Sequence, residues 1–532
     1  MSFRYEIIDC KAWLKDLVTS EYQETSLPKL FHNDVLDNDN QIVSSEIRTV
    51  PYLVGIFSTS QTQRFGKNKR GNVIYMVKPL NNKLPGFMIS YGGKLKGKLA
   101  VKFKYINWNN KLPSGEIIDV IGKFEEDNIT KILMYHHNIY PKKLKTTENQ
   151  FEESIERKDL THLNIFSIDP EGCVDIDDAL SITKEGDNVI VGVHIAQPIC
   201  WLSYQDIRTK MKYQFSTLYI DENNRKDLWD SQITEKASLF QDQKKPAYSV
   251  LFYFENNTLI KTEDFPSFII NKSKLTYENA KECPSAVTLE TFTENFTSID
   301  DYHDTVSYWM VKTNNHIGVK LKNKIPYRVN HQDDNLEVEI EGLPKDIGKI
   351  FTSKKIESAY YSMEEIRHQT LGLNYYCHFT SPIRRLIDTW IHFYLTYPSI
   401  RDEMDIDCQS INKLDKETKK FHRQLELDKI IKNMFFEKSN VEMTGYISEI
   451  LSYNSIEVYV DGVGFLKVRL FNFKFDYLVT KSISGNSLSL NYQDQSYNYK
   501  IGDSIELFFD KIDGILPRDK MMVRAKNSIS FI

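Results

Sequence analysis

The segment "FSIDPEGCVDIDDALSI", residues 166–182, constrains the fold of this chain more than any other feature. No Lys or Arg occurs between residues 159 and 183, yet ten consecutive positions carry five acids: Asp169, Glu171, Asp175, Asp177 and Asp178. Carboxylates that lie close together raise one another's pKa, so they cannot all stay ionised in a folded protein without a cation. The fold must therefore keep these side chains in water or supply positive charge to them.

Apolar residues interleave with these acids. Val174, Ile176, Ala179 and Leu180 predict that the segment is buried, against the alternative of a solvated acidic loop. "IFSI" predicts a strand ending at Asp169, and "ALSITKEGDNVIVGVHIA" predicts a β-hairpin. If the "DIDD" stretch is extended, two of its acids, at positions 175 and 177, share a face and the acid at 178 points elsewhere.

The acidic residues predict a metal site. Carboxylate oxygens favour a hard ion, so we expect Mg²⁺, with Mn²⁺ as the alternative. A calcium EF-hand does not fit. With Asp175 at position 1, Leu180 stands where that loop needs glycine, and Gly186 stands where it needs glutamate.

A second segment, "NYYCHFTSPIRRLIDTWIHFYL", predicts an amphipathic helix that begins at Ser381, with proline next to the cap. Arg384 and Arg385 would then lie in its first turn, where the helix dipole disfavours each by about 0.3–1 kcal/mol. A bound phosphate would explain that cost. Asp388, one turn beyond Arg384, would hold its side chain. The alternative is an ordinary surface arginine pair.

The charge distribution divides the chain. Its net charge is −5, but no acidic residue occurs between Glu46 and Glu116, where thirteen basic residues lie. The remainder therefore carries a net charge of −18. A basic block beside an acidic remainder predicts a module that binds a polyanion.

Aromatic residues interleave with the lysines of that block. This composition is typical of an OB-type surface, where bases stack on rings and lysines follow the phosphates. A basic sheet with aromatic residues in its core is the alternative. The residues concerned are Phe65, Tyr75, Phe87, Tyr91, Phe103, Tyr105 and Trp108.

Strand and turn patterns predict an α+β multidomain protein, with a mixed α/β catalytic domain between small OB-type barrels. For the last part a generic β-sandwich is the alternative. The expected domains are an N-terminal arm and linker with a short helical pattern (1–46), an OB barrel (47–142), the catalytic domain (143–438) and a C-terminal OB barrel (439–532).

Composition favours a soluble protein without a membrane span. No run of eighteen apolar residues occurs, and the N-terminus does not resemble a signal peptide. The six cysteines lie far apart and are expected as reduced thiols. We therefore expect a cytoplasmic location, with a nuclear one left open.

Both segments resemble the signatures of the ribonuclease II (RNB) exoribonucleases. "SIDPEGCVDIDDAL" is most similar to their eukaryotic exosome-associated branch, although we expect the chain to lack that branch's endonuclease domain. The resemblance covers roughly residues 50–530 and implies a cold-shock OB barrel, the catalytic domain and a C-terminal OB barrel.

The resemblance also implies roles for residues. It implies that Asp169, Asp175, Asp177 and Asp178 bind the metal, with Asp177 and Arg384 catalytic. Tyr219 resembles a tyrosine that stacks near the RNA 3′ end, and Tyr277 another site tyrosine; either ring could instead belong to the core. The remaining candidate RNA contacts are Arg385, Ser381 and His378.

The activity thus implied is processive 3′→5′ hydrolysis of single-stranded RNA to nucleoside 5′-monophosphates. A catalytically silent RNA-binding protein and a DNA exonuclease are the alternatives. We expect a monomer and no stable exosome association. The chain departs from the family at Gln197 and Tyr308, where carboxylates are common, and region 221–236 diverges.

Overall fold

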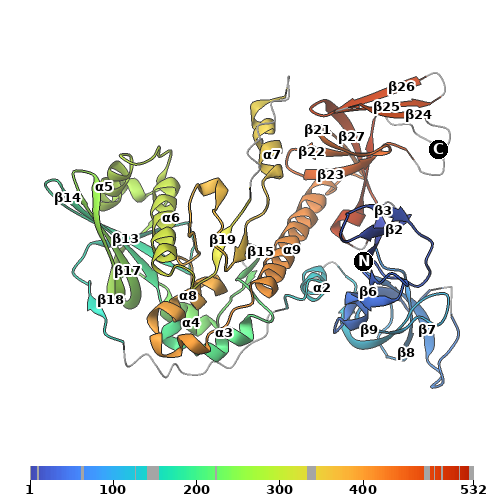
Figure 1. The fold of residues 1–532 in the computed structure, drawn as a ribbon, viewed down its shortest axis with the longest axis horizontal. Coiled ribbons are helices and arrows are strands. Elements are labelled where there is room, and N and C mark those ends of the chain that lie inside the picture. The colour runs from blue at the N-terminus through green and yellow to red at the C-terminus, as the bar shows by residue number, and fades with distance from the viewer. Residues whose placement is uncertain are drawn as a thin grey trace. The chain divides into compact units, whose positions relative to one another are not determined.

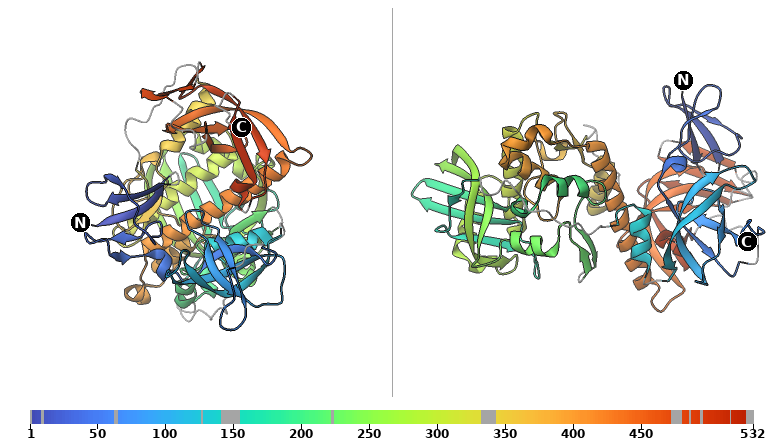
Figure 2. Two further views of the ribbon diagram at one scale, coloured as in Figure 1. Left: turned by 90° about the vertical axis from the view of Figure 1, so that its right-hand side faces the viewer. Right: turned by 90° about the horizontal axis from the view of Figure 1, so that it is seen from below.

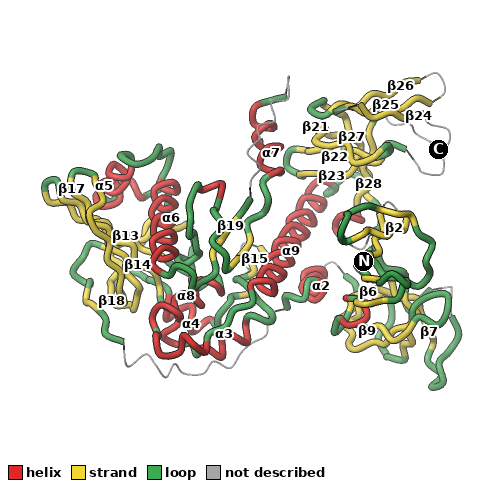
Figure 3. The backbone as a smooth tube through the Cα atoms, in the orientation of Figure 1, coloured by secondary structure: helices red, strands yellow, loops and turns green. Residues whose placement is uncertain are grey.

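The computed structural model describes most of the chain, and its contacts divide it into two compact units. Unit 1 comprises residues 1–140, 423–431 and 512–521, and unit 2 comprises residues 141–422, 432–511 and 522–532. Figures 1 and 3 show their helices and strands. The described residues are 2–8, 11–61, 65–125, 128–140, 155–221, 224–331, 343–471, 480–484, 486–492, 495–514 and 516–526.

Unit 1 begins with a five-stranded sheet, so the prediction of an arm and linker over residues 1–46 is wrong. Tyr5, Leu14, Leu30 and Leu36 form its small core. The polar tract is a turn rather than a linker, because the Asp37 carboxylate accepts the backbone N–H groups of residues 39 and 41. The elements are β1 (Phe3–Ile8), β2 (Lys11–Asp16), β3 (Tyr22–Glu24), β4 (Val35–Leu36), β5 (Ile42–Ser44) and α1 (Glu46–Thr49).

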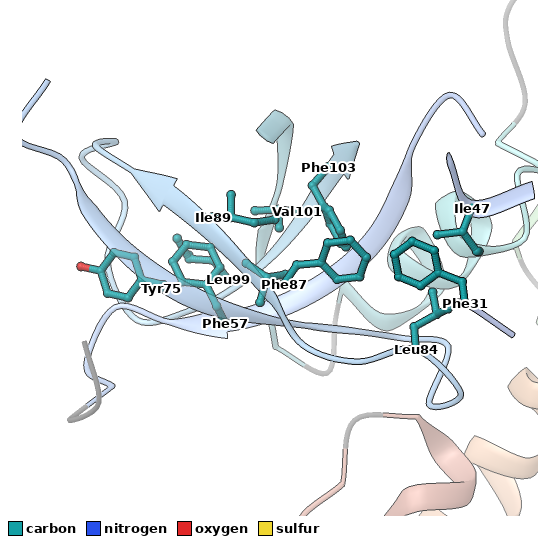
Figure 4. Packing of buried hydrophobic residues seen from close by; sticks show 11 residues of the cluster. Phe31, Ile47, Phe57, Tyr75, Leu84, Phe87, Ile89, Leu99, Val101 and Phe103 are labelled. Atoms are coloured by element: carbon teal, nitrogen blue, oxygen red, sulfur yellow. The ribbon is translucent and has the colours of Figure 1, made fainter. Parts of the chain in front are cut away.

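A closed five-stranded barrel follows, which confirms the predicted OB-type barrel. Its strand order is β10-β8-β7-β6-β9, and helix α2 (Ile129–His136) follows it. Figure 4 shows its core, with Phe31 and Ile47 from the N-terminal part at one end. The strands are β6 (Leu53–Ser58), β7 (Val73–Pro79), β8 (Phe87–Tyr91), β9 (Lys98–Asn107) and β10 (Ser114–Lys123).

The aromatic side chains of this barrel mostly serve its core. Tyr75, Phe87 and Phe103 are buried, so the prediction that they form a base-stacking surface is wrong, and the alternative of core aromatics holds for them. Their strands alternate, which places each ring inside and neighbouring lysines outside. Tyr105 and Trp108 are partly buried against Phe31.

Unit 2 contains a six-stranded mixed sheet in the order β11-β18-β12-β13-β14-β17, shown in teal and green in Figure 2. β13 and β14 pair antiparallel, as the hairpin prediction required. α5 packs on β13 and α6 on β14. The strands are β11 (Lys158–Asp159), β12 (Ile165–Asp169), β13 (Asp178–Glu185), β14 (Asn188–Ala196), β17 (Lys244–Glu255) and β18 (Thr258–Thr276).

Helices and two short ribbons complete the central part of the chain. The ribbons are β15 (Leu218–Asp221) with β16 (Asn224–Lys226), and β19 (Tyr327–Val329) with β20 (Tyr360–Ser362). The helices are α3 (Tyr204–Lys210), α4 (Ser231–Ala237), α5 (Pro284–Thr293), α6 (Tyr302–Lys320), α7 (Lys345–Lys355), α8 (Leu386–Thr396) and α9 (Cys408–Met434). Among the described residues, no helix is long and apolar enough to cross a membrane.

A second closed barrel, β21-β22-β23-β28-β27, confirms the C-terminal OB-type prediction over the β-sandwich. α7 packs on it through Phe351 and Phe465, and Lys354 pairs with Glu449. The predicted domain boundaries stay predictions; residues 142 and 143 lie outside the described part. The strands are β21 (Asn440–Ser452), β22 (Ser455–Val460), β23 (Gly464–Arg469), β27 (Ser504–Lys511) and β28 (Met521–Ala525), with a separate sheet of β24 (Thr480–Ser484), β25 (Ser487–Tyr492) and β26 (Gln495–Lys500).

The packing of Phe31 generates a stability prediction. Its fully buried ring lies 4.8 Å from the Trp108 ring and 5.8 Å from the Phe87 ring, centroid to centroid. We expect Phe31→Ala to destabilise unit 1 by about 3–5 kcal/mol, because it leaves a cavity in the barrel core, to which the N-terminal part contributes Phe31. Thermal unfolding measures this, with Val18→Ala, 75% exposed, as control. Equal melting temperatures of the two variants would contradict a role of Phe31 in the barrel core.

Candidate active site

The acidic segment connects two neighbouring strands of the unit 2 sheet. Asp169 ends β12, Asp178 begins β13, and residues 170–177 form the loop between them. The predicted burial holds for Ile176, which belongs to the core of the unit, as do Ala179 and Ile383. It is wrong for Val174, which is 49% exposed at the loop surface. The apolar residues thus anchor the loop that carries the acids.

The arginine segment folds differently from its prediction. Helix α8 begins at Leu386, not at Ser381, and Arg385 is an extended residue before it. The amides of Arg384 and Arg385 both donate to the Ser381 carbonyl, which makes a separate turn. Arg384 therefore lies before the helix and Arg385 is its N-cap residue, so neither lies in the first turn as predicted.

Asp388 explains this geometry. Its Oδ1 accepts the backbone N–H of Ser381 at 2.8 Å and Arg385 Nη2 at 2.8 Å. The buried carboxylate thus holds the turn against the first turn of α8. The predicted Arg384–Asp388 pair is wrong, because Asp388 pairs with Arg385 instead.

The two segments meet at Asp177, which is 3% exposed. Its Oδ1 accepts the backbone N–H of Ile383, 206 residues away, at 2.7 Å. Its Oδ2 lies 3.2 Å from Arg384 Nε. A single carboxylate therefore positions the arginine segment beside the acidic loop.

The β15–β16 ribbon adds two further side chains. Tyr219 Oη donates to Asp175 Oδ2 at 3.1 Å, and Arg225 Nη1 donates to Asp175 Oδ1 at 2.7 Å. The ribbon is tied to the arginine segment, because the Thr217 N–H donates to the Arg384 carbonyl. The expected sharing of a face by Asp175 and Asp177 in an extended strand is wrong: both lie in the loop and meet different partners.

Sequence reasoning missed Arg225. The sequence contains a pattern that could have indicated it: the polar run "DENN" between Tyr219 and Arg225 is typical of a turn and predicts a two-stranded ribbon. Such a ribbon brings Tyr219 and Arg225 together as a cross-strand pair, which is how the structure places them.

The other predicted contacts surround this centre. The Tyr277 ring lies 5.7 Å from that of His303, and burial, with the charges of Asp178 and Asp169, raises its pKa to about 12. His378 bonds to Tyr361 Oη through Nδ1 at 2.7 Å. Burial and the nearby Arg385 and Arg328 lower the pKa of His378 well below its usual value, so it is neutral.

Ser381 is buried, and its hydroxyl accepts from Arg384 Nη2 at 2.9 Å. Its evident role in the structure is to orient Arg384. The RNA contacts of Ser381, His378, Arg385, Tyr219 and Tyr277 stay predictions.

Electrostatics set the acids apart from ordinary carboxylates. Burial raises the pKa of Asp169 to about 6 and that of Asp178 to about 7, and the charge of Asp169 adds to the rise at Asp178. Burial also raises the pKa of Asp177 well above its usual value, although Arg384 and the Ile383 amide oppose the rise. The ionised forms of these three carboxyl groups are therefore disfavoured, as expected of a site that needs a cation.

The donor set fits a hard divalent cation at Asp169 and Asp178. Asp169 Oδ2 is buried and has no hydrogen-bond partner among the described residues. Asp175 has a donor on each oxygen, whereas Asp177 Oδ2, like Asp169 Oδ2, has no hydrogen-bond partner among the described residues and only an ion pair with Arg384. Oxygen donors of this kind favour Mg²⁺ or Mn²⁺. Metal binding by all four aspartates stays a prediction.

Within the described part of the chain, Asp301, His303 and Asp304 form the group of three ligand residues whose atoms all lie within 4.8 Å of one another, and the aspartates of the acidic segment form no such group. Asp301 Oδ1 caps α6 by accepting the Asp304 N–H. Asp301 and His303 are exposed, and exposed acidic groups commonly occur without a metal.

The departures at Gln197 and Tyr308 lie in packing contacts. Gln197 is fully buried, accepts from Arg157 Nη1 at 2.5 Å and donates to Thr396 Oγ1 at 3.1 Å. Tyr308 stacks on Phe296 with ring centroids 6.0 Å apart. Each therefore has a structural role.

The comparisons with known proteins agree with this architecture. The sequence matches the RNB domain over residues 157–324 and 293–397. Ribonuclease R of Aquifex aeolicus is 26% identical over 411 residues, covering 59% of this chain and 58% of that protein. The human exosome complex exonuclease RRP44 is 28% identical over 187 residues, 32% of this chain and 20% of that protein, which supports the exosome-branch resemblance only loosely.

Solved structures share the fold. The apo form of Mycoplasma genitalium RNase R has a TM-score of 0.74 at 17% identity, covering 99% of this chain and all of that one. Yeast Ssd1, a pseudonuclease, has a TM-score of 0.72 at 12% identity, covering 99% and 96%.

An RNB domain joined to small OB-like barrels defines a multidomain RNB architecture. The chain therefore contains an RNB domain and is similar to the RNB exoribonucleases. It spans about three fifths of the length of the Ribonuclease R sequences from Aquifex aeolicus and Mycoplasma genitalium that it matches, 58% and 63%.

The raised pKa of Asp178 generates a pH prediction. Between the ordinary value of 3.8 and about 7, the folded state holds a proton that the unfolded state has released. Stability without metal therefore falls as pH rises through this window. We expect Asp178→Asn to melt at a higher temperature than the wild type at pH 8 in EDTA, with the gap narrowing towards pH 4.

Thermal unfolding over this pH range tests the prediction, with Glu171→Gln, an exposed acid of the same loop, as control. Equal or lower melting of Asp178→Asn at pH 8 would contradict it.

Proposed function

We propose that this protein is a Mg²⁺-dependent, processive 3′→5′ exoribonuclease that hydrolyses single-stranded RNA to nucleoside 5′-monophosphates. The observation that carries the proposal is the meeting of Asp177 with Arg384 and the Ile383 amide. It unites a carboxylate cluster with a guanidinium, the two parts that phosphodiester hydrolysis needs. The RNB match and the relatives named Ribonuclease R support the same activity.

The residues divide the chemistry among them. Asp169 and Asp178 would hold the metal, which supplies an activated water and offsets charge on the departing oxygen. Arg384 is held by Asp177 and Ser381, so its guanidinium is oriented before substrate arrives and would stabilise charge on the phosphate. Tyr219, 46% exposed, offers a ring on which the terminal base would stack.

RNA is the proposed partner. The barrel of unit 1 carries the basic block, and its lysines would follow phosphates without reading sequence. A structure of Mycoplasma genitalium RNase R with single-stranded RNA supports this. A monomer, the absence of stable exosome association and a cytoplasmic location are parts of the proposal; the five described cysteines form no disulfide with one another.

A silent RNA-binding protein is the second candidate, because the fold also resembles the pseudonuclease Ssd1. A catalytically silent protein of this kind is expected to have lost at least one site aspartate. This chain retains Asp169, Asp175, Asp177, Asp178 and Arg384, which favours an active enzyme.

A 5′-labelled single-stranded RNA tests the activity. With Mg²⁺ we expect stepwise shortening from the 3′ end, and we expect Asp177→Asn to lower kcat by about 10²–10³, since it removes the carboxylate that orients Arg384. Tight RNA binding without monophosphate release in Mg²⁺ or Mn²⁺ would favour the silent candidate.

Glu171→Gln is the matched control in the same loop, and we expect it to retain most activity. Equal activity in Asp177→Asn would sink the proposed site. Cleavage of a DNA oligomer of the same sequence tests the alternative of a DNA exonuclease, because faster cleavage of the DNA would contradict an RNA substrate.

A further inference from the structure

Asp175 differs from the other site acids because both of its oxygens are occupied. Tyr219 donates to Oδ2 at 3.1 Å and Arg225 donates to Oδ1 at 2.7 Å. Asp175 and Arg225 side chains are 8% and 23% exposed, so water screens this pair little. The carboxylate is thus used to hold protein groups.

Arg225 is itself fixed from the other side. Its Nε lies 2.8 Å from Asp227 Oδ1, so the guanidinium spans two carboxylates at once. Gln214 Nε2 donates to the carbonyls of Lys226 and Asp227 and so holds the end of the ribbon. We call Asp175, Tyr219, Arg225 and Asp227 the Asp175 clamp.

Charge excludes the simplest role for Arg225. An arginine near a nuclease site could contact a phosphate directly. Here its charge is shared by two acids, which leaves the three groups with a net negative charge that repels phosphate. Arg225 therefore acts through its neighbours.

We propose that Arg225 is a positioning residue for the 3′-terminal nucleotide. By holding Asp175, it fixes the hydrogen bond that sets the Tyr219 ring, against which the terminal base stacks. The inference rests on the proposed function for the identity of the ligand.

A double-mutant cycle tests the clamp. The full-length protein is titrated in EDTA with a single-stranded RNA that carries 2-aminopurine at its 3′ terminus, and quenching gives Kd. Tyr219→Phe keeps the ring but loses the bond to Asp175, and Arg225→Gln releases Asp175 from the other side. We expect each to raise Kd about tenfold, since each removes a hydrogen bond to a charged group.

The double variant decides the mechanism. If both side chains act through Asp175, the double variant binds no more weakly than the weaker single variant. The proposal would be overturned if the increases in Kd of the two single variants multiply in the double variant. It would also be overturned if Arg225→Gln binds RNA with the wild-type Kd. Arg208→Gln, which removes an exposed arginine paired with Asp405, is the control and should bind as the wild type does.

Arg225→Lys tests whether the side chain must contact both Asp175 and Asp227, because lysine keeps the charge but reaches only one carboxylate. We expect Arg225→Lys to weaken RNA binding as Arg225→Gln does. Wild-type Kd in Arg225→Lys would contradict the need for a guanidinium that contacts both carboxylates. Cleavage of labelled RNA with Mg²⁺ tests the proposed function separately. The wild type could bind in EDTA and still fail to cleave, so the two ideas fail in different assays.

Discussion

The carboxylate of Asp177 is the contact on which the site depends. It bonds to the Ile383 amide and the Arg384 guanidinium, which lie more than two hundred residues further along the chain. Ile176 and Ile383 belong to the same apolar core, so apolar packing and the polar contacts of Asp177 hold the same two backbone segments together. Burying such a carboxylate is costly unless it is bonded, and these two donors offset that cost.

The arginines around the site are each assigned to a different acid. Arg384 pairs with Asp177, Arg225 with Asp175 and Arg385 with Asp388. Asp169 and Asp178 have no ion pair among the described residues, and burial raises their pKa values to about 6 and 7, as it also raises that of Asp177. Two carboxylates left without arginine carry the charge that one divalent cation would balance.

The sequence predicted the location of the site better than its local geometry. The two long motifs predicted Asp177 and Arg384 as site residues, and the spacing of turn residues predicted both barrels. The start of α8 was wrong because buried Asp388 binds the Ser381 amide and Arg385, a tertiary effect that cap rules for isolated helices do not contain. The N-terminal sheet was missed because its strands β3, β4 and β5 are only two or three residues long, too short to show an alternating pattern.

The lysines of the unit 1 barrel and the half-exposed Tyr219 ring of unit 2 would contact RNA in different ways. In the unit 1 barrel Phe87 and Phe103 fill the core, so its basic surface offers charge rather than a row of stacking rings. In unit 2 the half-exposed Tyr219 lies at the acids themselves. Charge contacts are indifferent to sequence, and a ring stacks on any base. An enzyme that removes nucleotides one after another needs both properties, since every nucleotide must in turn become the terminal one.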